Sequence, residues 1–461
     1  MDSKRNQKAA LDQSAQSTEE KQKELYLYSL RKMAEQNVDI NRNPLTQLYN
    51  LRAFFYQCGE VMQQQPNKKY AVIVMDIAQF KAVNEFCGRD AGDTVLKIIA
   101  GSMQCIESER ADTISCHVRA DVFSLFTSYD LEQELVKLVE RILKDIDAFP
   151  VNCKILPAFG ICTSEFAGLN VSFMKDCATM ALNTIKGKFY ASYAFFDERM
   201  REEQLREKQI ENEIVAALKN EEFALYIQPK VDMSTNQIIG GEALVRWLHP
   251  TQGMIPPGEF IPVLEKNGFI INVDAYIWEK VFAFIRDLEN SDIDPVPISI
   301  NVSRVHAYDN KFCKTLCNLR DKYQINPKYI PLELTESAFL GNEQEMYSRM
   351  EYLRGIGFSI SMDDFGTGYS TMKMLKNQPM DEIKIDREFI SDLENELSRI
   401  VISHTIRMLQ DMNTNIIVEG VETEVQKNFL LEHDCNRAQG FLFYKPMPAE
   451  EFRKLLLEST Y

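Results

Sequence analysis

FSISMDD, residues 358–364, is a short apolar stretch that ends in two adjacent aspartates. The same pattern, a strand-length apolar run that closes on polar residues, recurs along the second half of the chain. The other such stretches are FALYIQP (223–229), IIGGEALVRW (238–247), PISINVS (297–303), IPLELTE (330–336), DEIKID (381–386), NIIVEG (415–420) and AQGFLFY (438–444). Helix-length segments separate them. Eight repeated β-α units in about 240 residues predict a (β/α)₈ barrel, an α/β fold.

Polar side chains stand at or near the carboxyl ends of these predicted strands. They are Glu242, Asn301, Glu333, Asp363, Asp364, Lys384, Glu419 and Gln439, with Gln228 and Arg246 nearby. Because a barrel of this kind carries its site at the strands' carboxyl ends, we expect these side chains to meet at one rim. Carboxylates so close together repel each other unless cations balance them, and oxygen ligands suit Mg²⁺ or Mn²⁺. Adjacent aspartates can serve two ions about 3.5–4 Å apart, and Lys384 could orient the attacking water.

Composition narrows the classes of function. The chain has 461 residues, of which 45% are hydrophobic and 26% are charged, as in ordinary globular proteins of two or three domains. Its formal charge of -16 argues against broad binding of DNA or RNA, but not against a small anionic ligand held through metal ions. There is no long apolar run and the amino-terminal stretch is polar, so we expect no membrane span and a cytoplasmic protein. Its ten cysteines lack metal-ligand spacing and are expected to be free thiols.

The first half of the chain has a different pattern. Residues 1–41 are expected to form a linker helix, and the charged segment 197–220, which has no glycine or proline, a helix between two domains. Between these helices, residues 42–196 mix strand-like and helix-like segments. "KYAVIVMDI" predicts a buried strand, "DAGDTVLKIIAGSMQCI" a helix and "SCHVRADVFSLF" a hairpin. This region is expected to be an α+β domain, followed by the barrel over residues 221–461.

The barrel motifs are similar to those of a known family. "GEALVRWLHP", "FIPVLEKNG", "INVS", "ELTES", "DDFGTGYS", "KIDREFI", "VEGVET" and "QGFLFYKPMP" resemble the EAL domain, in the expected order over residues 221–461. The resemblance implies metal-dependent hydrolysis of cyclic di-GMP to linear pGpG, in a homodimer. It implies that two Mg²⁺ or Mn²⁺ ions bind Glu242, Asn301, Glu333, Asp363, Asp364 and Glu419. Val418 is the one nearby departure noted, since many members have alanine there.

The same resemblance implies further roles within the site. Lys384 and Gln439 would assist at the attacking water, with Glu242 and Glu419 as catalytic metal ligands. Gln228 and Arg246 would hold the dinucleotide, and Glu336 would anchor the loop that follows Asp364. A non-catalytic cyclic di-GMP receptor and an inert scaffold are the alternatives. Receptors of that kind typically lose metal ligands, whereas this sequence keeps every matching position.

The first domain resembles the GGDEF domain of diguanylate cyclases over residues 42–196, from "NPLTQLYNLRAF" and "MDIAQFKAVNEFCGRDAGDTVL". Its signature hairpin reads "RADVF" at 119–123, so the two glycines have become Arg119 and Ala120, and the metal-binding glutamate has become Val122. Side chains at the glycine positions crowd the approach of nucleotide phosphates, and valine cannot ligate a metal. We therefore expect no cyclase activity. The inhibitory pattern is also incomplete, because Thr113 stands where Arg110 should have an acidic partner.

Some residues of the nucleotide pocket match the family. Asp76 matches a metal position, Asn84 and Asp93 match the pair that reads guanine, and Lys186 matches a phosphate contact. GTP binding as a regulator is one interpretation of these matches. The alternative is a domain kept for folding, dimerisation or signal transmission.

Overall fold

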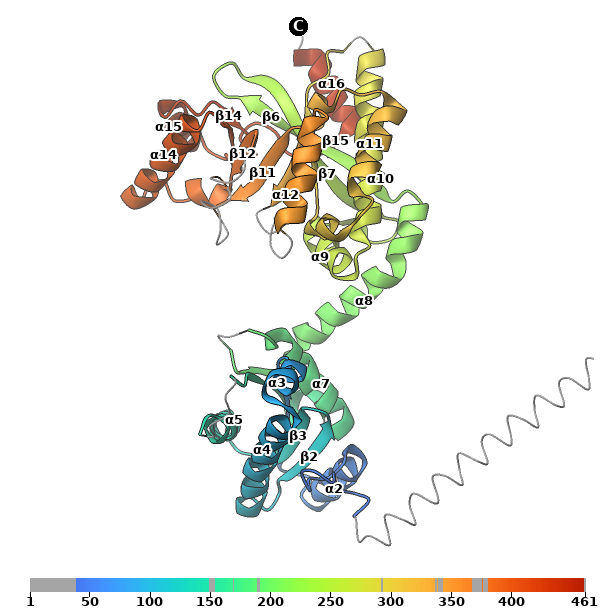
Figure 1. Ribbon diagram of the computed structural model, residues 1–461, viewed down its shortest axis with the longest axis vertical. Coiled ribbons are helices and arrows are strands. Elements are labelled where there is room, and N and C mark those ends of the chain that lie inside the picture. The colour runs from blue at the N-terminus through green and yellow to red at the C-terminus, as the bar shows by residue number, and fades with distance from the viewer. Residues whose placement is uncertain are drawn as a thin grey trace, which may run out of the picture. The chain divides into compact units, whose positions relative to one another are not determined.

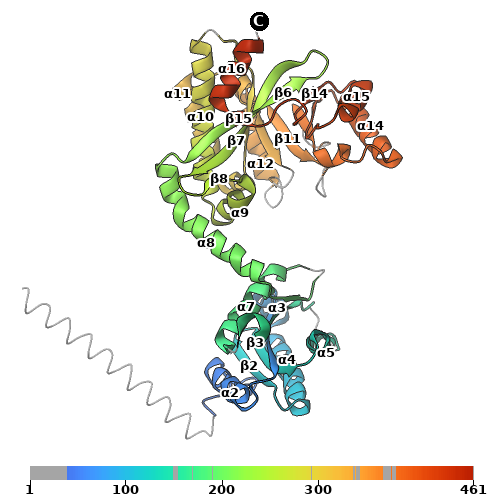
Figure 2. The same ribbon diagram turned by 180° about the vertical axis from the view of Figure 1, so that it is seen from behind.

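The computed structural model describes residues 39–148, 154–168, 170–188, 191–291, 293–335, 338, 343–366, 375 and 380–459. It divides into two compact units, Met1–Arg206 and Glu207–Tyr461, and each is described here by itself (Figures 1 and 2). Most of the linker helix predicted for residues 1–41 lies outside the described residues, and so does Glu336.

The first unit is built on a five-stranded sheet with the order β2-β3-β1-β4-β5. Its strands are β1 (Lys69–Ile77), β2 (Ile114–Arg119), β3 (Val122–Tyr129), β4 (Pro157–Thr163) and β5 (Tyr193–Phe195). β1 pairs antiparallel with β3 and β4, while β5 joins β4 in parallel. Nearly every residue of β1 is buried, as expected for a central strand whose two faces are both covered. The predicted strand and hairpin of this region are confirmed.

Helices cover both faces of this sheet. They are α2 (Leu51–Gln64), α3 (Phe80–Cys87), α4 (Arg89–Glu109), α5 (Glu132–Asp147), α6 (Ser164–Ala167) and α7 (Val171–Ile185). α4 and α5 pack with the β1 residues Ile73 and Met75 in one apolar cluster. α2 and α7 pack with Val72 and Val74 in a second cluster. Because neighbouring side chains of a strand point to opposite faces, β1 supplies both clusters, and the α+β architecture is confirmed.

The second unit is a closed eight-stranded barrel surrounded by helices (Figures 1 and 2). Its strands are β6 (Phe223–Asp232), β7 (Gln237–His249), β9 (Ile298–Asn301), β10 (Leu332–Thr335), β11 (Ile360–Phe365), β12 (Glu382–Ile385), β13 (Asn415–Val418) and β14 (Arg437–Ala438). Pairing of β6 with both β7 and β14 closes the ring. Two short strands, β8 (Gly253–Ile255) and β15 (Met447–Pro448), pair outside it with β7 and β6.

Two details of the predicted barrel are wrong. β6 runs antiparallel to both of its neighbours and joins β7 in a hairpin, so the first β-α unit is absent. The expected strand 438–444 is also shorter, since β14 ends at Ala438 and the chain turns at Gly440–Phe443. A Cβ at Gly440 would lie 2.1 Å from Val421 O, so the chain passes the Val421 backbone here too closely for any other residue.

The barrel's outer layer is helical. Its helices are α9 (Pro257–Asn267), α10 (Ile270–Asn290), α11 (Phe312–Tyr323), α12 (Glu343–Gly355), α14 (Glu396–Asp411), α15 (Glu424–Glu432) and α16 (Ala449–Ser459), with short turns η1 (Arg304–Tyr308), η2 (Pro327–Tyr329) and η4 (Arg387–Ile390). α8 (Glu198–Lys219) begins in the first unit and ends in the second, where Ile210 and Ile214 join the barrel's apolar core. Within the described part of the chain, no helix is long and apolar enough to cross a membrane.

Candidate active site

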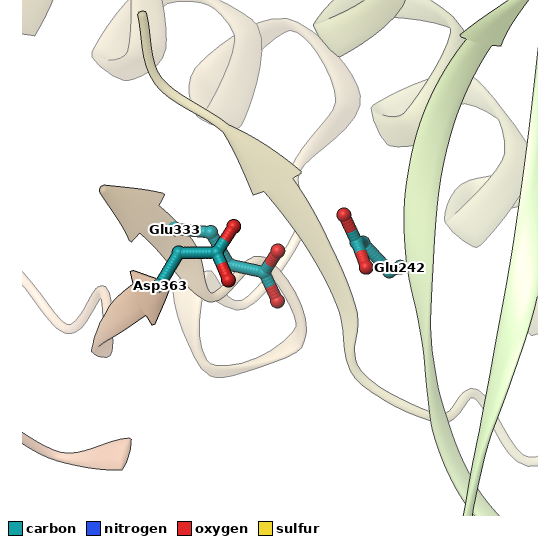
Figure 3. Close-up of side chains that lie close together, drawn as sticks. All are labelled: Glu242, Glu333 and Asp363. Carbon is teal, nitrogen blue, oxygen red and sulfur yellow. The ribbon is translucent and has the colours of Figure 1, made fainter. Parts of the chain in front are cut away.

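Strand pairing brings residues from distant parts of the chain to one end of the barrel. Gln228 of β6 lies opposite Glu242 of β7, and Asn301 at the end of β9 lies beside Glu333 of β10. Asp363 and Asp364 come from β11, Lys384 from β12, and Glu419 directly follows β13. Figure 3 shows the carboxyl groups of Glu242, Glu333 and Asp363 directed into the same space from different strands. The rim predicted from the strand endings therefore forms.

Lys384 is the centre of this cluster. Its ammonium nitrogen Nζ lies 3.2 Å from Glu242 Oε2, 2.9 Å from Glu333 Oε2 and 3.1 Å from Asp363 Oδ1. A fourth acid, Glu419, is closer still, with Oε1 at 2.6 Å. The lysine is buried away from bulk solvent, so its charge depends on these partners. One ammonium group therefore forms ion pairs with carboxylates from β7, β10, β11 and the end of β13.

A second buried lysine, which the sequence analysis did not single out, lies in the same cluster. Lys230 of β6 has its Nζ 2.7 Å from Glu333 Oε1 and 3.4 Å from Glu382 Oε1. The sequence feature that could have identified Lys230 is a lysine inside the apolar strand "FALYIQPKVD". A lysine at such a place is buried only when it is paired, which points to an acidic partner within the barrel.

Amide side chains complete the surroundings of Glu242. Gln439 Nε2 donates to Glu242 Oε2 at 2.7 Å and to Gln228 Oε1 at 3.0 Å. Asn301 Nδ2 donates to Glu242 Oε1 at 3.0 Å, and the Asn301 carbonyl accepts a hydrogen bond from Trp278 Nε1 at 3.0 Å. Both carboxylate oxygens of Glu242 are therefore held by neighbours, and three of the residues expected at the site form one hydrogen-bonded group with it.

The acids of the cluster differ in pKa because their neighbours differ. Burial alone would raise the pKa of Glu333, but the charges of Lys230 and Lys384 outweigh burial and lower it to about 2. Burial raises the pKa of Glu419 to about 8, against the opposing effect of Lys384. Burial likewise raises the pKa values of Glu242 and Asp363. The two lysines thus outweigh burial at Glu333 but not at Glu419, Glu242 or Asp363.

The donor set fits divalent metal ions. Carboxylate oxygens of Glu242, Glu333 and Asp363 lie within 4.8 Å of one another, and so do those of Asp363, Asp364 and Glu419. Asp363 belongs to both groups and could bridge two ions. All donors are oxygens, which Mg²⁺ and Mn²⁺ prefer, and a bound cation would favour the ionised form of the acids whose pKa burial raises. Asp364 has φ 53°, a left-handed conformation that places two consecutive aspartates at one site.

A cavity of about 310 Å³ opens beside this cluster. Glu242, Arg246 and Asn301 line it together with apolar side chains that include Ile261 and Trp278. Arg246 is half-buried, and its guanidinium carbon lies 5.7 Å from the centre of the Tyr226 ring. The cavity therefore combines a positive charge, an apolar wall and the carboxylate cluster, as needed to hold an anionic ligand with aromatic parts.

In the first unit, the RADVF hairpin is a tight turn between β2 and β3. Ala120 has φ 46°, the left-handed conformation that glycine adopts most readily. His117 supports the turn, with Nε2 2.7 Å from Ala120 O and Nδ1 3.2 Å from Thr46 Oγ1. Arg110 donates to Glu134 Oε2 at 3.1 Å, while Thr113 bonds Thr127. The arginine of the incomplete inhibitory pattern is thus paired with another acid.

Of the four residues expected to contact GTP, Lys186 and Asp76 contact each other directly. Lys186 Nζ lies 2.7 Å from Asp76 Oδ2, whereas Asp76 Oδ1 is buried and has no hydrogen-bond partner among the described residues. Asn84 packs against Gly92 so closely that a Cβ there would lie 1.9 Å from Asn84 Oδ1. Asp93 directly follows Gly92 in α4 and is exposed. The structure therefore shows an ion pair between Lys186 and Asp76. The proposed contacts of all four residues with GTP stay predictions.

Comparison with known proteins gives two family matches in tandem. The EAL domain model matches residues 211–446, and the diguanylate cyclase GGDEF domain model matches residues 40–188. The bifunctional diguanylate cyclase/cyclic di-GMP phosphodiesterase MucR of Pseudomonas aeruginosa is 31% identical over 414 residues, which cover 88% of this chain and 60% of MucR. The cyclic di-GMP phosphodiesterase NbdA of the same organism is 29% identical over 93% of this chain and 54% of its own length.

A solved structure resembles the barrel unit. The MucR phosphodiesterase in complex with cyclic di-GMP is 35% identical, with a TM-score of 0.51, over 53% of this chain and 99% of the solved one. The chain spans 60% of MucR and 54% of NbdA, so both relatives contain further sequence that this chain does not match.

Proposed function

Because the chain belongs to the EAL domain family, with a GGDEF domain in tandem, we propose that it hydrolyses cyclic di-GMP to linear pGpG. The observation that carries the proposal is the contact of Lys384 with four carboxylates at the rim of the barrel. The names of MucR and NbdA as cyclic di-GMP phosphodiesterases support it, as does the solved complex of the MucR barrel.

We propose that the cluster holds two divalent ions. The residues that would hold them are Glu242, Asn301, Glu333, Asp363, Asp364 and Glu419. Bound there, two Mg²⁺ or Mn²⁺ ions would lower the pKa of a water molecule and neutralise charge on the phosphodiester. This assignment accounts for a buried cluster in which acidic side chains outnumber the two lysines.

The other side chains act on the water and the substrate. Arg246 binds a phosphate of cyclic di-GMP from the wall of the cavity. Gln228, which accepts a hydrogen bond from Gln439, contacts the dinucleotide. Lys384 and Gln439, which both contact Glu242, orient the attacking water. The water gives up a proton as its oxygen forms a bond to phosphorus, the bond to the 3′ oxygen breaks, and the 3′ oxygen takes up a proton. The ring opens and pGpG is the product.

The experiment is incubation of the purified chain with cyclic di-GMP and Mg²⁺ or Mn²⁺, with chromatographic separation of products. Glu242→Gln is the matched inactive variant, because it keeps the side-chain volume but removes a carboxylate from the cluster. We expect pGpG from the native chain and at least a thousandfold lower rate in the variant, about 4 kcal/mol in the barrier. Equal rates for both would contradict the proposed site.

We further propose that the GGDEF unit makes no cyclic di-GMP. Val122 stands at the metal-ligand position of the hairpin, and Arg119 and Ala120 add side chains where the family has glycine. Incubation of the Glu242→Gln variant with GTP and Mg²⁺ tests this proposal, because the variant cannot consume a product. Accumulation of cyclic di-GMP would contradict it.

We propose that the GGDEF unit binds GTP through Asp76, Asn84, Asp93 and Lys186, and that this binding has a regulatory role. Lys186 and Asp76 already form an ion pair, so the nucleotide phosphates would have to compete with Asp76 for that lysine. Calorimetric titration with GTP, followed by assay of cyclic di-GMP hydrolysis, tests both binding and regulation. An unchanged hydrolysis rate at saturating GTP would overturn the regulatory role.

We also propose that the chain forms a homodimer through its barrel unit. Three apolar side chains of α14, those of Leu397, Ile400 and Val401, are exposed, and Leu397 and Val401 line a hollow with Phe389. Such a patch is typical of an association surface. Light scattering of the native chain and of a Leu397→Glu variant tests this. A native chain that stays monomeric at micromolar concentration would contradict the proposal.

A further inference from the structure

Lys230 is a buried cation that is not among the described residues lining the cavity beside the cluster. It belongs to the antiparallel strand β6, is 4% exposed, and contacts two acids from other strands, Glu333 of β10 and Glu382 of β12. Burial of a lysine costs free energy unless its charge is paired, so these contacts are needed for the folded barrel. The arrangement of its partners suggests that pairing is not its whole role.

The two carboxylate oxygens of Glu333 are divided between two lysines. Oε1 lies 2.7 Å from Lys230 Nζ, and Oε2 lies 2.9 Å from Lys384 Nζ. Glu333 is 1% exposed, so bulk solvent does not reach either contact. With one oxygen held on each side, rotation of the carboxylate about its own axis would break a contact to a buried charge.

Lys230 contacts Oε1 of Glu333, so Oε2 is the oxygen that faces the other acids. Lys384 contacts Oε2 of Glu333 together with Oε2 of Glu242 and Oδ1 of Asp363, so these oxygens share one space. Oε1 is on the opposite side, against Lys230. A cation bound among the three acids would therefore meet Glu333 through a single oxygen.

Glu382 in turn fixes Lys230. Its Oε1 lies 3.4 Å from Lys230 Nζ and also accepts a hydrogen bond from Ser361 Oγ at 3.1 Å. Charges consequently alternate from Glu382 to Lys230, Glu333 and Lys384. Ser361 belongs to β11, the strand that carries Asp363, so the supporting contacts and the cluster are built on the same rigid strands.

We propose that Lys230 is a positioning residue that holds Glu333 as a one-oxygen ligand for a divalent ion at the barrel's rim. It acts through Glu333 and touches neither the substrate nor the ion. The inference rests on the proposed function, because it requires that the carboxylate cluster bind metal. Loss of such a supporting contact to a metal ligand typically lowers metal affinity or activity by about 10–100-fold.

The test compares the native full-length chain with a Lys230→Met/Glu382→Met double variant. Removing both charges avoids leaving one buried and unpaired, and similar volumes preserve packing. The dissociation constant for Mn²⁺ is measured by calorimetry on metal-free protein, and kcat and KM are measured over a range of Mn²⁺ concentrations. The control is Arg354→Met, which removes a cation 2.8 Å from Asp381, beside the start of β12 and outside the cluster.

We expect the Mn²⁺ dissociation constant of the double variant to rise by roughly 10–100-fold, with kcat lowered and recovered by added Mn²⁺. KM for cyclic di-GMP at saturating Mn²⁺ and the metal affinity of Arg354→Met should stay unchanged. A folded double variant with the native Mn²⁺ affinity would overturn the inference while leaving the proposed function intact. A native chain that binds no Mn²⁺ would overturn both.

Should the double variant fail to fold, Lys230→Gln/Glu382→Gln replaces it. Glutamine keeps polar groups at both positions but is uncharged, and at position 230 it is also shorter than lysine, so the ammonium contact with Glu333 Oε1 is lost. The same rise in the Mn²⁺ dissociation constant is expected, and native affinity in this variant would overturn the inference.

Discussion

Lys384 Nζ lies 2.6 Å from Glu419 Oε1, so a cation from β12 directly contacts a carboxylate that follows β13 at the rim of the barrel. The same ammonium group contacts three further acids, which makes it the main positive charge among them. In the metal-free protein it stabilises side chains that would otherwise repel each other. The contribution of Lys384 to the free energy of unfolding should therefore depend on whether divalent ions are bound.

Lys384→Met should destabilise the metal-free protein by about 3–5 kcal/mol, because the variant leaves buried carboxylates without their partner. Mn²⁺ should then raise the melting temperature of the variant more than that of the native chain, since ions replace the missing charge. Thermal unfolding with and without Mn²⁺ measures both effects. Lys322→Met, which removes an exposed pair with Glu279, is the control. An equal gain from Mn²⁺ in Lys384→Met and the native chain would argue against the ions occupying this cluster.

Arg246→Ala should raise KM for cyclic di-GMP by roughly 10–100-fold with a smaller change in kcat. The expectation follows from the loss of a charge-assisted hydrogen bond to a phosphate, worth about 1.5–3 kcal/mol. Steady-state kinetics provide the measurement. Arg246→Lys keeps the charge but not the planar guanidinium, and should give a smaller rise. A fall in kcat at constant KM would instead place Arg246 in the chemical step.

Gly440→Ala should lower both stability and activity. The new Cβ would lie 2.1 Å from Val421 O and 2.4 Å from Val421 N, and a backbone cannot move aside as a flexible side chain can. We expect a loss of about 1–3 kcal/mol in the free energy of unfolding. Activity should fall because the adjacent Gln439 donates to Glu242. Urea unfolding and the hydrolysis rate test this, with Gly258→Ala as control, since nothing lies within 4 Å of a Cβ at Gly258.

The hairpin of the GGDEF unit should lose stability in acid through His117. Burial lowers the pKa of this imidazole, although its hydrogen bond to Ala120 opposes the shift. The unfolded side chain takes up a proton near its usual pKa of about 6.5, before the folded one does. Stability is therefore fully present above that pH and is lost as the pH falls toward the lower pKa of the folded state.

Hydrogen exchange of β2 and β3 peptides, corrected for intrinsic rates, measures this dependence between about pH 7.5 and 5.5. His117→Gln, which keeps polar groups but has no ionisable ring, should show a weaker dependence on pH. An identical dependence in both proteins would assign it to another group.

The sequence predicted the rim of the barrel because a polar residue in or at the end of a short buried strand has its position set by the strand. Asn301, Glu333 and Lys384 illustrate this, since each lies in a four-residue strand. The direction of β6 was not predictable in the same way, because a run of apolar residues is compatible with either direction of pairing. The turn after β14 depends on the close approach of Gly440 to Val421, which is a tertiary contact.

Lys230 was missed for a related reason. A single lysine in an apolar strand does not reveal its partners, which lie 103 and 152 residues further along the chain. The contact becomes visible only when the barrel closes. Conversely, the substitutions in RADVF could be found directly, because they change residue types within one short motif. The roles assigned to the site residues stay predictions until they are measured.

The most direct test of the central claim measures binding and cleavage of cyclic di-GMP side by side in the native chain and in Asp363→Asn. The rim is proposed to be a hydrolytic centre, so the native chain should convert the bound dinucleotide to pGpG with Mg²⁺ or Mn²⁺. Asp363→Asn removes the carboxylate common to both acidic groups and should bind cyclic di-GMP without cleaving it. A native chain that binds the dinucleotide and leaves it intact with saturating Mg²⁺ and with saturating Mn²⁺ would contradict the account.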